Sequence, residues 1–548
     1  MTSAPPELNH TFTDADLDAL LAYGTVVSYA DGDELSREGT RNVDALVVLE
    51  GQIDIHLPTT DGERRVGWME RGQFAGDITL VTGQATLVNV RASGASKVLR
   101  ISHADFQRLL VEDSHLSDIF VRVLTARRAW AKARNLNSIV LIGSAFDRQL
   151  FALRDLMTKH NVPHCWLDPE RDAVGVRILA GRALDPSALP VAIVGDHTPL
   201  VQPSVADVSM LLGLDSVADD SHVDLVVVGA GPAGLACAVY AASEGLSVIV
   251  VDSKGPGGQA GTSSKIENYL GFPMGISGRE LAERATVQAQ KFGALFASPA
   301  TVESVAPTGS HYCVRLADGR AFDSRAVVVA SGADYRRLPI EGLEGYEGRG
   351  IYYGATAMEA QLCARSKVCV VGAGNSAGQG AVFLSETCEE VHVLYRRADI
   401  RETMSEYLVR RLESTPNIHL HPQTEIEGFE EVGGRLAGVQ LKGDGAAQGH
   451  LATPFVFLFI GAAPCTDWVP DAAARDRRGF LLTGVDLESD ALAESGWPLD
   501  RAPSRFETSI PRFYAVGDVR SGGVKRVASA VGEGSGVIAD VHRAIAEA

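Results

Sequence analysis

Two glycine-rich segments have the spacing with which a peptide backbone approaches a pyrophosphate. Residues 229–234 read Gly-Ala-Gly-Pro-Ala-Gly, and residues 372–377 read Gly-Ala-Gly-Asn-Ser-Ala. In such a turn the first glycine permits a tight bend, the second admits the phosphates, and the last position stays small so that a helix packs closely. The helix N-terminus adds free N–H groups and the positive end of its dipole. Two turns therefore predict two dinucleotide cofactors.

The residues around the first turn predict a strand, a helix and a second strand. Residues 224–228 form a β-branched run typical of a buried parallel strand, and residues 235–243 are small and apolar, as a closely packed helix requires. The strand expected at 246–251 ends in Asp252, 23 residues after Gly229 and close to the spacing of a ribose-binding carboxylate. We expect this cofactor to be bound by Gly229, Gly231, Ala233, Gly234 and Asp252.

Two distant segments indicate that the first cofactor is FAD. One predicted strand leads to Gly332, and another, at residues 514–516, leads to Gly517 and Asp518. The Asp518 carboxylate can accept hydrogen bonds from ribityl or ribose hydroxyls. Residues 526–548 predict a helix whose positive end would stabilise the charge that a reduced flavin gathers near N1 and C2=O.

The strand after the second turn ends in cations, where an NAD site would carry an acid. Residues 367–371, 375–385 and 391–395 predict a strand, a helix and a strand, followed by Arg396, Arg397 and Arg401. Guanidinium groups suit a ribose 2′-phosphate because their planar fork makes charge-assisted bidentate bonds. A solvated basic loop is the alternative, but the position favours NADPH. Its expected ligands are Gly372, Gly374, Asn375, Ser376, Ala377, Arg396, Arg397 and Arg401.

From about residue 222 onward the chain resembles the low-molecular-weight thioredoxin reductases. The similarity lies in the two turns and in residues 257–259, 266–269, 460–461 and 517–518. It implies an α/β protein with two Rossmann-like three-layer domains, an FAD domain (222–337 and 459–548) interrupted by an NADPH domain (338–458). It also implies rotation between the domains and a homodimer. By the same resemblance the FAD contacts include Gly258, Gln259, Asn268, Lys525, Arg526 and Val527.

One segment departs from that family. The family carries Cys-Ala-Thr-Cys-Asp before the second turn, whereas residues 354–358 here read Gly-Ala-Thr-Ala-Met. Without this dithiol a flavin cannot pass electrons on by thiol–disulfide exchange. The seven cysteines form no C-x-x-C pair, and Cys363 is the nearest candidate thiol. Hydride transfer from NADPH to flavin N5 needs no acid–base pair, so no other catalytic side chain is expected.

Three functions remain open. The favoured one is an FAD-dependent NADPH oxidoreductase with a non-disulfide acceptor, which is ferredoxin or flavodoxin, a quinone, or oxygen. Ferredoxin–NADP reductases, which share this scaffold without the cysteine pair, support it by resemblance. The second is a disulfide reductase that uses Cys363. The third is a non-enzymatic redox or nucleotide sensor.

Residues 1–134 predict a different fold, a β-roll with helices. A helix at 12–23, short strands and helices at 104–110 and 116–133 resemble a cyclic-nucleotide-binding domain. Residues 72–77 match the start of that family's phosphate cassette, with Asp77 in place of the usual glutamate. The arginine that pairs the cyclic phosphate is replaced by Gln84-Ala85, which forfeits a charge-assisted bond. We expect the fold without cyclic-nucleotide binding, as a docking, dimerisation or regulatory module.

Residues 137–215 predict a small α/β domain that resembles glutaredoxin and thioredoxin. Strands at 139–143 and 165–167, a helix at 148–160 and a strand opened by Pro190 follow the order of that family, in which this proline is cis. The active-site turn would fall at residues 144–147, which contain no cysteine.

Composition limits the remaining possibilities. The chain has 548 residues, too many for one core, and a net charge of −19, which argues against nucleic acid and anionic membranes. The same charge disfavours an acidic protein acceptor. Unpaired cysteines fit a reducing compartment, and neither a signal peptide nor a spanning apolar stretch is evident, so we expect a cytoplasmic protein. No metal site is expected.

Overall fold

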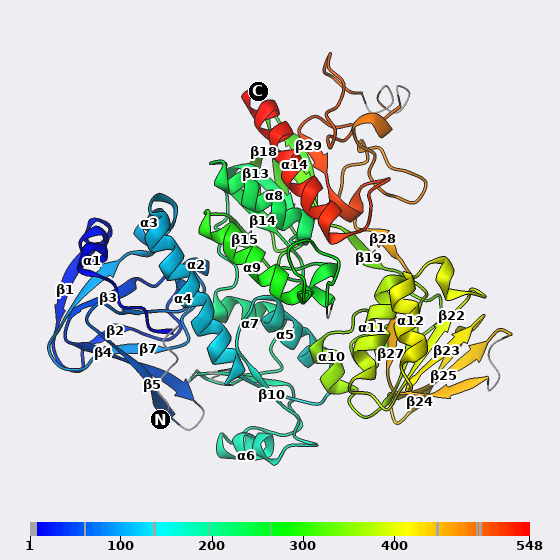
Figure 1. Ribbon diagram of the computed structural model, residues 1–548, viewed down its shortest axis with the longest axis horizontal. Coiled ribbons are helices and arrows are strands. Elements are labelled where there is room, and N and C mark those ends of the chain that lie inside the picture. Colours follow the sequence, from blue (N-terminus) through cyan, green and yellow to red (C-terminus); the bar gives the residue numbers. More distant parts are fainter. Residues whose placement is uncertain are drawn as a thin grey trace.

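The structure, a computed structural model, describes residues 8–59, 62–134, 139–195, 197–263, 265–444, 449–488, 492 and 496–547. Figure 1 shows a β-roll at one end, an α/β domain at the other, and two further units between them. We call these, in chain order, the β-roll, the central unit (139–214), the first domain (221–335 and 462–547) and the second domain (336–461). The second domain is therefore an insertion in the first.

The β-roll consists of two four-stranded antiparallel sheets. Their strands are β1 (Thr25–Tyr29), β8 (Ser96–Ile101), β3 (Ala45–Glu50) and β6 (Phe74–Ala75), and β2 (Glu34–Ser36), β7 (Asn89–Ala92), β4 (Gln52–Thr59) and β5 (Gly62–Glu70). Helix α1 (Asp14–Leu20) precedes the sheets, and α3 (His103–Glu112) and α4 (Ser114–Ala133) follow them. Strand β7 begins only at Asn89, because Ala85 and Leu87 just before it contact the central unit instead.

The central unit is a four-stranded sheet in the order β10-β9-β11-β12, in which only β9 and β10 are parallel. Its elements are β9 (Ile139–Ile142), α5 (Arg148–Lys159), β10 (Cys165–Leu167), α6 (Ala173–Gly181), β11 (Val191–Val194), β12 (Leu200–Val201) and α7 (Val205–Leu212). Helix α5 begins where Asp147 accepts a hydrogen bond from the Leu150 N–H. The Leu189–Pro190 peptide is cis, as the resemblance implied.

The first domain has a seven-stranded sheet in the order β15-β14-β13-β18-β17-β16, with β29 paired to β18. Its elements are β13 (Ser221–Val228), α8 (Pro232–Ser243), β14 (Val248–Val251), α9 (Gly278–Lys291), β15 (Leu295–Ala297), β16 (Val302–Thr308), β17 (His311–Leu316), β18 (Ala321–Val329), β29 (Phe513–Ala515) and α14 (Val527–Ala546). Strands β13, β14, β18 and β29 are parallel, so their carboxyl ends meet at one edge. Small residues on α8 allow α14 to pack closely against it.

The second domain has a five-stranded parallel sheet, β20-β27-β21-β22-β23. Its elements are β20 (Ile351–Tyr352), α10 (Ala357–Leu362), β21 (Lys367–Val371), α11 (Asn375–Ser385), β22 (Glu390–Tyr395), α12 (Glu406–Ser414), β23 (Ile418–Pro422) and β27 (Val456–Leu458), with β24 (Glu425–Val432), β25 (Arg435–Lys442) and β26 (His450–Ala452) in a separate sheet. The chain crosses between the two domains through an antiparallel pair, β19 (Ala333–Tyr335) and β28 (Ala462–Pro464).

The central unit contacts both the first and the second domain (Figure 1). Toward the second domain, the Phe146 ring stacks on Phe455 with centroids 6.0 Å apart, and the Arg435 guanidinium lies 4.7 Å from the Phe146 centroid. Toward the first domain, the His160 ring lies beside Gly255, and its Nε2 is 3.4 Å from the Ser298 hydroxyl.

Candidate cofactor sites

The first glycine turn is closed to side chains at the two positions where the fold requires it. Gly229 has φ +111°, and a Cβ there would lie 2.2 Å from the Ala330 carbonyl oxygen. A Cβ on Gly234 would lie 1.8 Å from the Gly229 oxygen, so α8 can only pack here with glycine. At Gly231 the nearest atom to a built Cβ is the Gly258 Cα, 3.8 Å away. This cradle therefore fits the pyrophosphate predicted for it.

Asp252 lies at this turn, and its carboxylate already braces the main chain. One oxygen accepts from the Ala230 N–H at 2.7 Å, and the other accepts from the N–H groups of Lys254 and Gly255 at 2.9 and 2.8 Å. These bonds shape the start of the loop that carries Gly258. A ribose hydroxyl would have to share the carboxylate with these donors. The position of Asp252 in the sequence does not reveal that it also braces the main chain.

The carboxyl edge of the sheet also carries the C-terminal residues predicted to bind the first cofactor. Gly517 has φ +74°, and Asp518 beside it is half-buried, which raises the pKa of its carboxyl. Glu533 on α14 was not among the predicted residues, yet its carboxylate accepts from the Gly517 N–H at 2.7 Å and pairs with Arg520 at 2.6 Å. A glutamate on an amphipathic helix gives no sequence signal for such a role.

Other predicted FAD residues lie on the loops around this edge. The side-chain amide of Gln259 donates to the Ala333 carbonyl, where the chain crosses between the domains. Gly332 has φ +67°, and no atom lies within 4 Å of a Cβ built on it. Asn268 is exposed and makes no side-chain hydrogen bond with the described residues.

Three more predicted FAD residues lie at the start of α14. Lys525 has its Nζ 4.2 Å from the Phe480 ring centroid, and Arg526 and Val527 begin the helix. Both Lys525 and Arg526 are exposed. This helix start therefore carries two cations at the edge where Asp518 lies.

The second glycine turn repeats the geometry of the first. Gly372 has φ +143°, and a Cβ there would lie 2.4 Å from the Phe459 carbonyl oxygen, whereas Gly374 has no atom within 4 Å of a built Cβ. Asn375 opens α11 and is held by Ser405, which donates its N–H to the amide oxygen at 2.7 Å and accepts from the amide nitrogen at 3.0 Å. The turn therefore presents open backbone at the N-terminus of α11, as a pyrophosphate requires.

The last two residues of this turn differ in their surroundings. Ser376 is exposed, so its hydroxyl is free to meet a ligand. Ala377 is fully buried in the core of the second domain. The small residue at 377 therefore serves the packing of α11 on the sheet, which is the role that the glycine pattern predicts for the last position.

The three predicted arginines lie exposed at the end of β22. Arg397 pairs with Glu402 at 2.5 Å, and Arg401 pairs with Glu413 at 2.7 Å. Arg396 makes no ion pair with the described residues. Of the three guanidinium groups, the one on Arg396 can therefore meet an incoming phosphate without first losing a carboxylate partner.

Gly354 opens a segment, residues 354–357, that contains no cysteine, and it lies against the loop of the first domain that carries Thr262. A Cβ on Gly354 would lie 3.0 Å from the Thr262 Cβ, and the Thr262 hydroxyl donates to the Gln259 carbonyl at 2.8 Å. A second link between the domains is the ion pair of Arg411 with Glu267 at 3.2 Å. In this orientation Gly354 of the second domain contacts the predicted FAD loop.

Cys363 lies away from that loop, in the core of the second domain. It follows the six residues of α10, which span about 9 Å at 1.5 Å per residue. Its Sγ is 3.5 Å from the Sγ of Cys388, and both side chains are buried. The hydrogen bond with Cys388, together with burial, raises the pKa of the Cys363 thiol, which makes it a poor nucleophile.

Metal clusters and membrane spans are both missing from the part of the chain that the structure describes. These residues contain no group of three or more His, Cys, Asp or Glu side chains that could hold a metal ion. Among the same residues, no helix is long and apolar enough to cross a bilayer.

Comparisons with known proteins agree with this architecture. Residues 223–534, more than half of the chain, match the model of the pyridine nucleotide-disulphide oxidoreductases, and residues 26–113 match that of the cyclic nucleotide-binding domain. The chain is 30% identical to the thioredoxin reductase of Treponema pallidum, over 58% of this chain and 95% of that protein. The thioredoxin reductase of Bacillus subtilis is 28% identical over 58% of this chain and 93% of that protein.

A solved structure gives the same result for the fold. The thioredoxin reductase of T. acidophilum superposes with a TM-score of 0.52 at 27% identity, over 59% of this chain and 99% of that one. The chain therefore belongs to the pyridine nucleotide-disulphide oxidoreductase family and has the flavin oxidoreductase scaffold of the thioredoxin reductases.

Proposed function

We propose that the protein is an NADPH-dependent flavin oxidoreductase that delivers its electrons to an acceptor other than a neighbouring dithiol. The observation that carries this proposal is the contact of Gly354 with Thr262. It brings a segment without cysteine to the loop that would hold the flavin. An acceptor must then meet the flavin itself, because no thiol in this segment can relay the electrons.

FAD fits the first domain and NADPH fits the second. The backbone cradle at Gly231 and Gly258 suits a pyrophosphate, and Asp518 lies at the same sheet edge to bind hydroxyls. In the second domain the open backbone at Gly374 suits a pyrophosphate. The exposed guanidinium of Arg396 suits a 2′-phosphate. When bound, FAD would accept a hydride from NADPH and release electrons to the acceptor.

The net charge of −19 bears on the choice of acceptor. An acidic carrier such as ferredoxin or flavodoxin would be repelled over long range, whereas a quinone or oxygen would not. Among the acceptors considered, a small molecule is therefore favoured.

The test is an anaerobic reduction in two steps. NADPH is mixed with the flavin-loaded protein and the loss of the visible flavin band is followed, with NADH as the comparison. Quinone, oxygen, ferredoxin and thioredoxin are then added one at a time. Fast reoxidation by any of the first three, with none by thioredoxin, is the expected result, and efficient reoxidation by thioredoxin would overturn the proposal.

One observation favours the disulfide-reductase alternative. Cys363 and Cys388 form a sulfur pair with 3.5 Å between the two Sγ atoms, although the pair is buried. If this pair carried electrons, Cys363→Ala would abolish turnover with flavin content unchanged. We expect turnover to persist.

We also propose that the central unit is a glutaredoxin-like domain without redox chemistry of its own. Its strand order, β10-β9-β11-β12, with β11 antiparallel to β9, supports the fold. Residues 144–147 carry no cysteine, so this unit has a structural role at the contacts with Phe455 and Ser298.

A further inference from the structure

The loop between β6 and β7, residues 76–88, lies where the β-roll meets two other units. We call it the cassette loop. Its short helix α2 (Thr79–Thr82) packs on α9 of the first domain, and Val287 of α9 packs against the core of the β-roll. Leu87 packs in turn against the core of the central unit. One loop thus contributes to two interfaces.

Two polar groups of the cassette loop, the Ala85 amide and the Asp77 carboxylate, are bonded to other residues of the chain. The Ala85 N–H donates to the Leu212 carbonyl, at the end of α7, over 3.0 Å. The Asp77 carboxylate accepts from Arg128 of α4 at 2.5 and 2.9 Å, and also from the Thr79 N–H at 3.0 Å. These bonds use the amide and the carboxylate that an external ligand of this loop would need.

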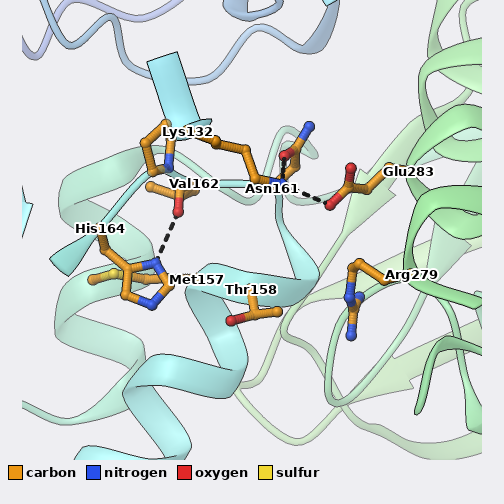
Figure 2. Close-up of a pocket in the computed structure, with 9 residues that line it drawn as sticks. Lys132, Met157, Thr158, Asn161, Val162, His164, Arg279 and Glu283 are labelled. Atoms are coloured by element: carbon orange, nitrogen blue, oxygen red, sulfur yellow. Dashed lines mark hydrogen bonds and ion pairs between the residues drawn. The ribbon is translucent and has the colours of Figure 1, made fainter. Parts of the chain in front are cut away.

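Helix α4 extends the same junction to the other units. Arg128 donates to the Asn161 carbonyl of the central unit at 2.8 Å. One turn further on, the Lys132 ammonium donates to the Asn161 side chain at 2.7 Å and to Glu283 of α9 at 3.0 Å, as Figure 2 shows. A cavity of about 180 Å³ is lined by Lys132, Asn161 and Glu283 together with Arg279.

The segment after α7 also contacts Arg41 of the β-roll. Gly213 has φ +60°, and a Cβ there would lie 2.5 Å from the Arg41 Nε. The Arg41 guanidinium also donates to the Asp215 carbonyl. Residues 212–215 are therefore held between the cassette loop and Arg41.

We propose that the cassette loop is an internal docking surface, which holds the central unit and α9 to the β-roll, and that this docking excludes a cyclic nucleotide. A phosphate at Gln84 and Ala85 would face the Leu212 carbonyl oxygen instead of a free N–H donor. The site is also covered, since Gln84 is 9% and Ala85 5% exposed. No cation stands at these two positions to offset the repulsion.

Hydrogen exchange of the full-length protein tests the docking. The Ala85 amide should exchange slowly in the native chain. Gly213→Ala adds a Cβ that meets Arg41 and strains a left-handed residue, so exchange at residues 85–87 should rise about tenfold. Gly245→Ala is the matched control, because Gly245 has φ +88° after α8 but nothing within 4 Å of its Cβ.

Two results would overturn the proposal. The first is that the amides of residues 85–87 exchange as fast in the native chain as those of an exposed loop. The same conclusion follows if their exchange rates in Gly213→Ala and in Arg41→Ala both equal the native rate. Arg41→Ala removes the hydrogen bond to the Asp215 carbonyl without changing a glycine. It replaces Gly213→Ala in the test if that variant folds poorly. The other is saturable binding of cyclic AMP or cyclic GMP to the native protein in calorimetry, where we expect none.

Discussion

The segment at residues 354–357 and the cassette loop each keep a family's scaffold while lacking its reactive residue. The first lacks two cysteines, and it presents Gly354 to the loop that would hold FAD. The second lacks an arginine, and the chain's own Leu212 carbonyl bonds to it. The difference is that residues 354–357 face a loop of another domain, whereas the cassette loop is bonded to a neighbouring unit.

The largest expected effect is the loss of bound FAD from a variant of the first glycine turn. Gly231→Val adds a side chain at an open position, so the fold should persist while the pyrophosphate is excluded and the purified protein loses its flavin band. Gly374→Val makes the same change in the second turn, and this control should retain flavin but lose NADPH binding. Normal flavin content in Gly231→Val would contradict the assigned site.

The next effect concerns the coenzyme. Arg396→Glu should weaken NADPH binding roughly 10- to 100-fold with little change for NADH, because a charge-assisted bond becomes a repulsion. KM for the two coenzymes in steady-state reduction gives the measurement. Arg410→Glu, at an exposed arginine on α12, serves as the control. If the substitution weakened the binding of NADPH and NADH equally, Arg396 would not recognise the 2′-phosphate.

Two cysteines added to residues 354–357 should give this segment the thiol chemistry that it lacks. Gly354→Cys with Ala357→Cys should raise NADPH-dependent reduction of an aromatic disulfide about tenfold over background, since a dithiol then faces the loop at Thr262. Ala357→Cys alone should stay at background, because one thiol cannot form the internal disulfide. No gain in the double variant would show that the orientation at Gly354 is not the productive one.

The contact of the central unit with the first domain should depend on pH. Burial lowers the pKa of His160 to about 3, well below its ordinary value of 6.5. As the pH falls below 6.5, His160 becomes protonated in the unfolded chain but stays neutral in the folded one. The free energy of unfolding should therefore be about 2 kcal/mol lower at pH 5 than at pH 7.5. Thermal unfolding at pH 7.5 and pH 5 should show a smaller acid loss in His160→Gln, whereas the exposed His222→Gln should behave like the native protein.

The smallest expected effect concerns the ion pair between Lys132 and Glu283. Lys132→Ala removes a half-exposed bridge between α4 and α9, so the apparent Tm should fall by no more than about 2 °C. Lys291→Ala, on the same helix as Glu283, is the control. A fall much larger than this would mean that the bonds of Lys132 to Asn161 and Glu283 stabilise the junction more than an exposed ion pair does.

Periodic segments and glycine turns could be predicted from the sequence, and contacts between units could not. The expected strand at 367–371 and helix at 375–385 coincide with β21 and α11, because each has one apolar pattern and a clear boundary. The bond to Leu212 could not be predicted, since a backbone carbonyl leaves no trace in residue type. The Cys363–Cys388 pair likewise joins positions 25 apart that carry no shared motif.

The stacked rings at the edge of the central unit oppose movement of the second domain. If the second domain swings about the β19–β28 pair, Phe146 must slide off Phe455 and leave the Arg435 guanidinium. The oxidoreductase match begins at residue 223, so Phe146 lies outside the part of the chain that its relatives share. Any such swing must first separate these two aromatic side chains, a contact worth about 1 kcal/mol that a protein without the central unit does not have to break.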